Sequence, residues 1–239
     1  MKRLLSMGAE KLFQICKCFR KDERGGRHLP ELTLLEWYGK SHTYMDLMDQ
    51  CEGLLRHIAD GLNIGDCLSF QGKDISLASP FERLTVAEAF ARYTDTTAES
   101  ALSADRFDEI LSFKIEPHLG LKRPCILHDY PAPLASLAKL HPTNTEVAQR
   151  FELYVAGLEL ANGFTELTDA AVQKQRFEKE NSRRAERGQS PLPLPHKFLT
   201  DLKQMPDAAG IALGLDRLVM LFCDTLSIDE VVAFTPESL

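Results

Sequence analysis

Residues 19–38, FRKDERGGRHLPELTLLEWY, consist of a basic loop followed by a stretch of alternating side chains. Upstream, residues 12–22 also alternate, and three apolar side chains share one expected face: Phe13, Ile15 and Phe19. Downstream, residues 31–38 have the same period of two. The loop between them contains Gly25 and Gly26, which favour a turn. The sequence therefore predicts two antiparallel strands joined by a basic loop.

Helices and further strands are expected along the rest of the chain. Apolar spacing predicts helices over residues 43–62, 85–93, 105–118 and 216–222, and a polar, exposed helix over residues 169–186. Thr43 and Thr85 supply N-caps, and Gly120 closes the third helix. Strands are expected over residues 150–155, 158–167 and 210–214, and a proline-rich connector over residues 189–196. This order predicts an α+β fold, an antiparallel sheet flanked by helices.

The composition is that of a globular protein, and its charge argues against some function classes. The chain has 239 residues, with 28 basic and 35 acidic side chains and a net charge of −7. Such an acidic chain is not a generic nucleic-acid binder, although residues 17–28 are locally basic. We expect no membrane span and no signal peptide, because no apolar run approaches roughly 20 residues. Six scattered cysteines without zinc spacing favour the reducing cytoplasm.

Three segments carry side chains suited to chemistry: residues 19–38, GLELANGFTEL at 157–167 and GIALGLDRL at 210–218. An arginine beside a basic loop, such as Arg20, is able to clamp a polyphosphate. Glu152 and Glu159, on neighbouring strands, offer the oxygen ligands that Mg²⁺ prefers. A further strand glutamate, Glu166, is able to receive an ammonium group. Each feature taken alone is more often a solvated side chain or a salt bridge.

Taken together and in this order, the three segments resemble class II aminoacyl-tRNA synthetases of the lysyl branch. FRxDE followed by RHxPELTxxE looks like motif 2, GIALGLDRL looks like motif 3, and ELANGFTEL is similar to the lysine-specific stretch. The LEWY ending and Ala212 are closer still to the branch that ligates lysine to elongation factor P. The resemblance covers nearly the whole chain. It implies an ATP-dependent ligase with a class II catalytic-domain fold that forms an aminoacyl adenylate.

The resemblance also implies roles for individual residues. Arg20 and Arg217 would be catalytic, on the α- and γ-phosphates of ATP, and Glu152 and Glu159 would bind Mg²⁺. The other expected ATP contacts, besides Glu159, are Asp22, His28, Leu29, Leu32, Leu160 and Gly214. The substrate pocket would consist of Glu36, Tyr38, Asn162, Phe164, Glu166 and Ala212. Within it, Glu166 and Tyr38 would receive the side-chain ammonium of the substrate.

Three positions depart from the family pattern, which bears on ATP affinity rather than on the fold. Asp22 stands where motif 2 has Glu, Leu29 replaces an Asn that contacts ATP, and Leu32 replaces a Phe that stacks on adenine. We also expect residues 1–239 to form one catalytic domain. It would lack an anticodon-binding domain and the motif 1 segment that builds the dimer interface.

The expected substrates are lysine or (R)-β-lysine together with ATP, and the expected acceptor is a lysine of elongation factor P. Ala212 favours the β-amino acid, because a single methyl group in a packed pocket is worth roughly 1–3 kcal/mol. A homodimer is expected, whereas tRNA and membranes are not expected partners. Two alternatives stay open: a catalytic fragment of a lysyl-tRNA synthetase, and a non-catalytic paralogue that binds ATP or lysine.

Overall fold

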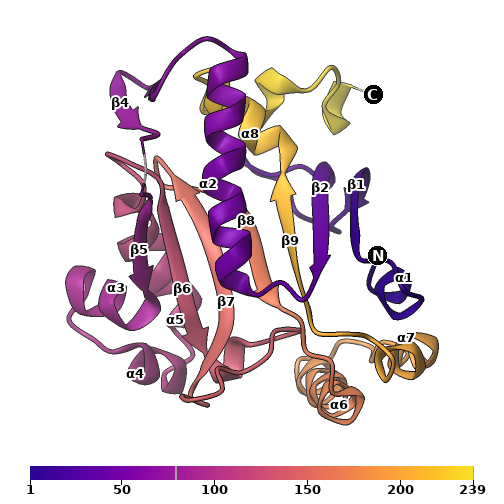
Figure 1. Ribbon diagram of the computed structural model, residues 1–239. Helices are drawn as coiled ribbons and strands as arrows, with labels where there is room; N and C mark the ends of the chain where they lie inside the picture. Colours follow the sequence, from indigo (N-terminus) through magenta and orange to yellow (C-terminus); the bar gives the residue numbers. More distant parts are fainter. Residues whose placement is uncertain (79, 239) are drawn as a thin grey trace.

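The computed structural model describes residues 1–78 and 80–238, which fold around a seven-stranded sheet (Figure 1). In space the strand order is β1-β2-β9-β8-β7-β6-β5. The strand bounds are β1 (Lys11–Phe19), β2 (Glu31–Lys40), β5 (Glu82–Thr85), β6 (Cys125–Pro131), β7 (Val147–Val155), β8 (Leu158–Thr165) and β9 (Ala208–Gly214). Neighbouring strands are antiparallel except for β5 and β6. The predicted antiparallel sheet is confirmed, and β3 (Cys67–Phe70) and β4 (Lys73–Ser76) form a separate hairpin.

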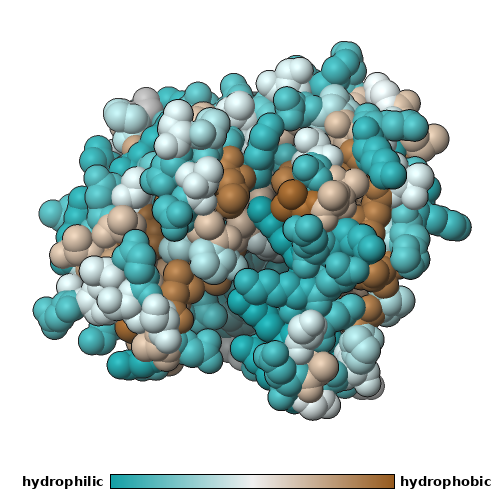
Figure 2. All heavy atoms as spheres, turned by 90° about the horizontal axis from the view of Figure 1, so that it is seen from below, coloured by the Kyte–Doolittle hydropathy of each residue, from teal (hydrophilic) through white to brown (hydrophobic). Residues whose placement is uncertain are grey.

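Helices cover parts of both faces and the lower edge of the sheet. Their bounds are α1 (Lys2–Ser6), α2 (Tyr44–Gly61), α3 (Val86–Tyr93), α4 (Ala98–Ser103), α5 (Phe107–Ile110), α6 (Ala170–Glu186), α7 (His196–Leu202) and α8 (Leu215–Phe222). Within the described part of the chain, no helix has both the length and the apolar character needed to cross a membrane. Seen from below, hydrophilic side chains cover most of the surface and border a hollow near its middle (Figure 2).

Helix α2 determines which face of the sheet is left for a site. It crosses one face, as Figure 1 shows, and its buried side chains, such as Leu47 and Leu55, pack with Ile211 and Leu213 of β9. Its start is fixed by a capping box between Thr43 and Asp46. A second apolar cluster lies where α3, α4 and α5 pack against β5 and β6. Residues of β2, β8 and β9 that alternate with the α2-facing positions therefore project from the opposite face.

Most predicted elements are found within a few residues of their expected bounds. The expected helices over residues 43–62, 85–93, 169–186 and 216–222 correspond to α2, α3, α6 and α8. Residues 189–195 are irregular, as expected for the connector, but α7 follows at once and was not predicted. The expected helix over residues 105–118 is instead a short α-helix, a π-helical turn and a 3-10 turn. Pro117 contributes to this break because it has no N–H to donate to the helical ladder.

The alternation in β1 is correct, but its apolar residues face outward. Phe13, Ile15 and Phe19 are 72%, 60% and 74% exposed. The reason is the reach of α2, which packs against β7, β8 and β9 rather than over β1 at the sheet edge. The other, half-buried face of β1, which includes Gln14, is therefore the one that faces the site.

Candidate active site

The register of the sheet brings predicted substrate residues together in two rows that run across the strands. Across β1, β2, β9, β8 and β7 the first row is Gln14, Glu36, Ala212, Asn162 and Glu152. Across the same strands the second row is Leu12, Tyr38, Gly210, Phe164 and Arg150. Positions two apart on a strand point to the same face, so both rows project away from α2. Five of the six predicted substrate residues thus share one surface.

Glu166, the sixth of these residues, follows the end of β8 and is almost completely buried. Its side chain is 1% exposed, and its Oε2 lies 2.6 Å from the Nζ of Lys2. Its Oε1 has no hydrogen-bond partner among the described residues. Burial raises the pKa of the Glu166 carboxyl to about 7, and Glu36 adds to the shift while Lys2 opposes it. Burial and the charge of Glu166 also raise the pKa of Tyr38, so its hydroxyl stays protonated.

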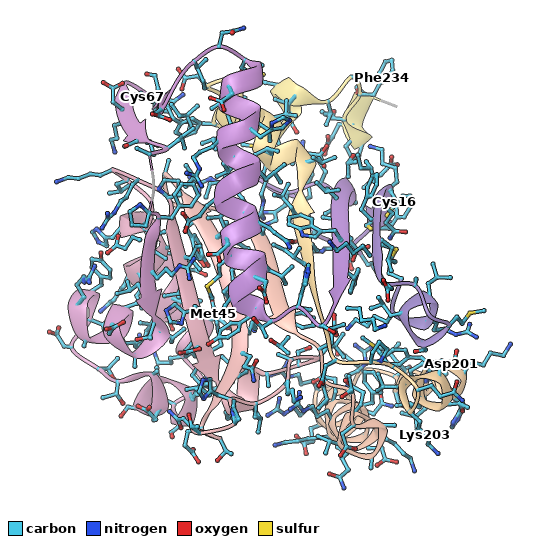
Figure 3. The ribbon with its side chains drawn as sticks, viewed as in Figure 1. Cys16, Met45, Cys67, Asp201, Lys203 and Phe234 are labelled. Atoms are coloured by element: carbon cyan, nitrogen blue, oxygen red, sulfur yellow. The ribbon has the colours of Figure 1, made fainter. Side chains whose placement is uncertain are left out.

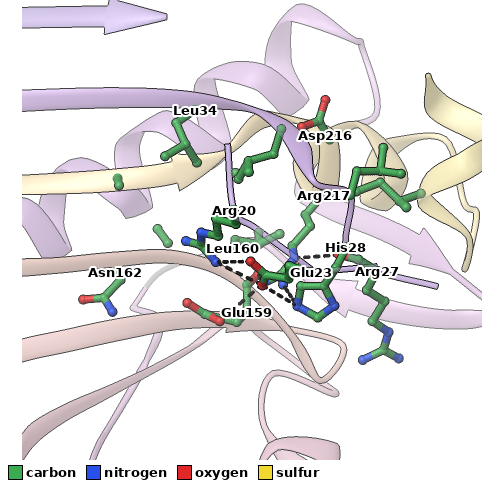
Figure 4. Close-up of a pocket in the computed structure, with 16 residues that line it drawn as sticks. Arg20, Glu23, Arg27, His28, Leu34, Glu159, Leu160, Asn162, Asp216 and Arg217 are labelled. Atoms are coloured by element: carbon green, nitrogen blue, oxygen red, sulfur yellow. Dashed lines mark hydrogen bonds and ion pairs between the residues drawn. The ribbon is translucent and has the colours of Figure 1, made fainter. Parts of the chain in front are cut away.

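A cleft adjoins the first of these rows (Figure 4). Its walls come from the loop after β1, from β2, β8 and β9, and from the start of α8. The predicted site residues that line it are Arg20, His28, Leu29, Leu32, Glu159, Leu160, Asn162, Ala212, Gly214 and Arg217. One cleft therefore contains most of the expected ATP contacts and two members of the expected lysine pocket.

Arg217 ties together three parts of this cleft. It lies in the first turn of α8, and its Nη1 donates to the carbonyl oxygen of Glu159 at 2.8 Å and lies 3.3 Å from Glu159 Oε2. Its Nε donates to the carbonyl oxygen of Arg27 at 3.2 Å, and its Nη2 contacts the ring of His28. Burial and the charge of Arg217 lower the pKa of His28. The guanidinium thus links the basic loop to β8, and it is held with its side chain 17% exposed.

Arg20, in the loop after β1, lines the cleft, whereas Asp22 from the same loop does not. Strand β1 ends at Phe19, so the alternation expected through residue 22 does not continue. Asp22 has a φ of 60°, and its side chain is 84% exposed outside the cleft. Glu23 lines the cleft instead, and it accepts a hydrogen bond from Arg20 at 3.2 Å. The ATP contact expected of Asp22 is therefore not supported by this geometry.

The cleft residue Glu159 and two further carboxylates, Glu116 and Glu152, lie close enough together to repel one another. Partial burial raises the pKa of Glu159, and the neighbouring Glu152 adds to this effect. Burial and Glu152 likewise raise the pKa of Glu116. The repulsion between neighbouring carboxylates falls when a cation binds to them. Among the described residues, however, no three His, Cys, Asp or Glu side chains are placed so as to hold a metal ion by themselves.

The two expected Mg²⁺ ligands, Glu152 and Glu159, differ in how many hydrogen bonds their carboxylates already accept. Glu152 already accepts four hydrogen bonds, from Tyr130 and Tyr154 at 2.6 Å, Arg150 at 2.7 Å and Asn162 at 3.1 Å. A carboxylate offers about four lone-pair positions, so Glu152 would have to exchange one of these bonds for a metal. Among the described residues, the Glu159 carboxylate accepts a single side-chain hydrogen bond, from Arg217. Glu159 therefore fits a magnesium ion that is also held by substrate phosphates.

Some residues of the cleft were not predicted from the sequence. They are Glu23, Arg27, Leu34, Ala161, Asp216 and Ile228. Asp216 Oδ2 accepts a hydrogen bond from the backbone N–H of Thr33 at 2.6 Å, which fixes β2 against α8. In the sequence, the one indication that Asp216 belongs to the site was its position next to Arg217. Leu29 both lines the cleft and packs with Met220 and Ile228, so its side chain belongs to a small apolar cluster as well.

The mostly antiparallel sheet, with two arginines in one cleft and a buried carboxylate beside the pocket rows, agrees with the class II synthetase-like fold expected from the sequence. Residues 1–238 match the family described as tRNA synthetases class II (D, K and N), and the chain belongs to this family. Among curated proteins it is similar to the elongation factor P–(R)-β-lysine ligase of Edwardsiella ictaluri, with 39% identity over 98% of this chain and 74% of the relative. The ligase of the same name from Salmonella gallinarum is 40% identical over the same shares, and that from Pectobacterium carotovorum is 38% identical over 99% and 75%.

Proposed function

We propose that the protein is an ATP-dependent ligase that activates lysine or (R)-β-lysine as an adenylate and transfers it to a lysine of elongation factor P. The observation that carries the proposal is the continuity of the cleft. The side chains of Asn162 and Ala212, from the expected lysine pocket, line the same cleft as Arg20 and Arg217. The names of the relatives, at about 40% identity over nearly the whole chain, support the same substrate class.

The chemistry requires no nucleophile from the protein. The substrate carboxylate attacks the α-phosphorus of ATP in line, an O–P bond forms, and pyrophosphate leaves. Arg20 and Arg217 stabilise the negative charge that develops on the phosphoryl oxygens. Holding both reactants in one cleft supplies much of the remaining rate enhancement. The ε-amine of the acceptor lysine then attacks the activated carbonyl, AMP leaves, an amide bond forms and the amine loses a proton.

Magnesium fits this proposal through Glu159, with Glu152 as a second ligand when it exchanges one of its hydrogen bonds. Bound with ATP, the ion would neutralise phosphate charge. Glu152 also has a role that does not depend on magnesium. Glu152 accepts hydrogen bonds from Arg150 and Asn162, and so holds Asn162 in the pocket row.

We further propose that residues 1–239 act as one catalytic domain, in the cytoplasm and as a homodimer. The exposed apolar side chains of Phe13, Ile15 and Phe19 on the edge strand β1 support an association surface, because an apolar edge strand is rarely left uncovered. We do not propose tRNA as an acceptor, because the chain is acidic, with a net charge of −7, and tRNA binding needs a basic surface.

ATP–pyrophosphate exchange tests the first step. The reaction is run without amino acid, with L-lysine and with (R)-β-lysine, and transfer is read as a mass increase of purified elongation factor P. We expect exchange stimulated mainly by (R)-β-lysine, with modification of elongation factor P. Exchange with L-lysine and charging of tRNA would favour a lysyl-tRNA synthetase fragment instead. Folded protein that binds ATP or lysine but gives no exchange would favour a non-catalytic paralogue.

A further inference from the structure

The ammonium group of Lys2 lies in the part of the pocket proposed for the substrate's own side-chain ammonium. Lys2 Nζ is 2.6 Å from Glu166 Oε2 and 5.0 Å from the centre of the Phe164 ring. These are the ion pair and the cation–π contact that the side chain of a bound lysine would make. The Lys2 side chain is 14% exposed, so it is largely withdrawn from water.

The rest of α1 is anchored without Lys2. Leu5 is 1% exposed and packs with Leu202, Met205 and Ala208. Arg3 pairs with Asp201, which projects from α7 (Figure 3). Because these contacts hold the helix, the Lys2 side chain would not need the backbone of α1 to move in order to leave Glu166. Beyond its ion pair with Glu166, Lys2 Nζ has no hydrogen bond to any other described residue.

Among the residues assigned to the expected lysine pocket, Glu36 is the other carboxylate, and its Oε2 already accepts a hydrogen bond from Gln14 at 2.7 Å. Two ammonium groups beside the single buried carboxylate of Glu166 would repel each other strongly, because interactions in a buried site are weakly screened.

We infer that Lys2 is an internal competitor for the lysine subsite, a side-chain gate that the substrate ammonium displaces from Glu166 and Phe164. This inference rests on the proposed function, since it assigns Glu166 to the substrate. The apparent affinity for substrate is the intrinsic affinity multiplied by the fraction of molecules in which Lys2 has left the subsite free. It also keeps Glu166 from being buried without a counter-charge when no substrate is bound.

Calorimetric titration with L-lysine and with pentane-1,5-diamine, without ATP, tests the gate. Lys2→Met removes the competing charge, Lys2→Arg keeps it, and Arg3→Met is the matched control, because it removes a charge from the same helix outside the pocket. We expect Lys2→Met to bind both ligands about tenfold more tightly, whereas Lys2→Arg and Arg3→Met bind like the wild type. Equal or weaker binding by Lys2→Met would overturn the gate.

A second measurement on the wild-type protein avoids any question of whether a variant folds. Acetylation of Lys2 is followed by mass spectrometry as a ratio to acetylation of Lys21, whose side chain is 92% exposed. The ratio cancels reagent consumed by the added ligand. We expect saturating lysine to raise the ratio, because a displaced Lys2 reaches solvent, and an unchanged or lower ratio would contradict the gate. If Lys2→Met binds lysine more tightly but neither the wild type nor any variant catalyses pyrophosphate exchange, the gate is supported and the ligase function is rejected. If exchange occurs but Lys2→Met binds lysine like the wild type, the ligase function is supported and the gate is rejected.

Discussion

Ala212 on β9 pairs directly with Glu36 on β2, so its methyl group stands in the row between Glu36 and Asn162. This methyl group takes up space in the row that the proposed function assigns to the substrate. We predict that Ala212→Gly lowers the preference for (R)-β-lysine over L-lysine about tenfold, because one methyl group in a packed pocket is worth about 1–3 kcal/mol. The measurement is the ratio of kcat/KM for the two isomers in pyrophosphate exchange.

A matched control comes from the same strand. Ala209 is fully buried but belongs to the α2-facing core, so Ala209→Gly tests the loss of a methyl group outside the pocket. We expect it to lower the melting temperature and to leave the isomer ratio unchanged. An isomer ratio that shifts equally in both variants would show that Ala212 acts through general packing.

Arg217 is the side chain whose loss we expect to affect ATP most. It holds Glu159, Arg27 and His28 in one arrangement, and the proposal places it on the γ-phosphate. We predict that Arg217→Ala lowers kcat/KM for ATP by about 100-fold or more, as expected when a charged group that stabilises the transition state is removed. Arg106→Ala is the control, because Arg106 pairs with Glu109 at an exposed position. Exchange by Arg217→Ala at a rate close to that of the control would remove Arg217 from the proposed machinery.

Gly210 allows Tyr38 and Glu166 to approach the backbone of β9. A Cβ at this position would lie 2.2 Å from Tyr38 Cε1 and 2.8 Å from Glu166 Oε1. We predict that Gly210→Ala lowers the free energy of unfolding by about 1–3 kcal/mol through overpacking. It should also weaken lysine binding, because both displaced side chains belong to the proposed ammonium subsite. Thermal unfolding and calorimetry provide the two readouts.

Gly53→Ala is the contrasting variant. An added Cβ at Gly53, within α2, has no atom within 4 Å. We expect this variant to be more stable by about 0.5–1 kcal/mol, because alanine is the better helix former. Its lysine affinity should match that of the wild type. A Gly210→Ala variant with normal lysine affinity would show that the pocket tolerates a shift of Tyr38.

The parts of the site that were predicted from sequence are those set by local alternation. Glu36 and Tyr38, or Asn162 and Phe164, share a face because they are two apart on a strand, and the register then aligns the strands. The outward face of Phe13 was not predictable in this way, because it depends on how far α2 extends across the sheet. The position of Lys2 was missed for a related reason, since it depends on packing of Leu5 against α7, a helix the sequence did not indicate.

Lysine affinity should rise with pH through the titration of Glu166. Burial raises the pKa of this carboxyl from 4.5 to about 7, so below about 7 the group is mostly protonated and cannot pair with an ammonium. The ligand amine stays charged across this range, because its ordinary pKa is about 10.4. We therefore predict tighter binding at pH 8 than at pH 6 in calorimetry without ATP, and a flat profile for Glu166→Gln. Glu159→Gln should keep the dependence, since Glu159 belongs to the ATP side of the cleft.

The same shift has the opposite consequence for stability. A carboxyl whose pKa is higher in the folded than in the unfolded protein contributes stability below pH 4.5, and this contribution is lost as the pH rises through about 7. Between these values the wild type should therefore lose stability relative to Glu166→Gln, as measured by the midpoint of urea unfolding. Ligand binding and unfolding thus depend on pH with opposite signs at one residue. Stability that did not decline in this window would mean that Lys2 keeps Glu166 ionised, and the lysine affinity would then be independent of pH as well.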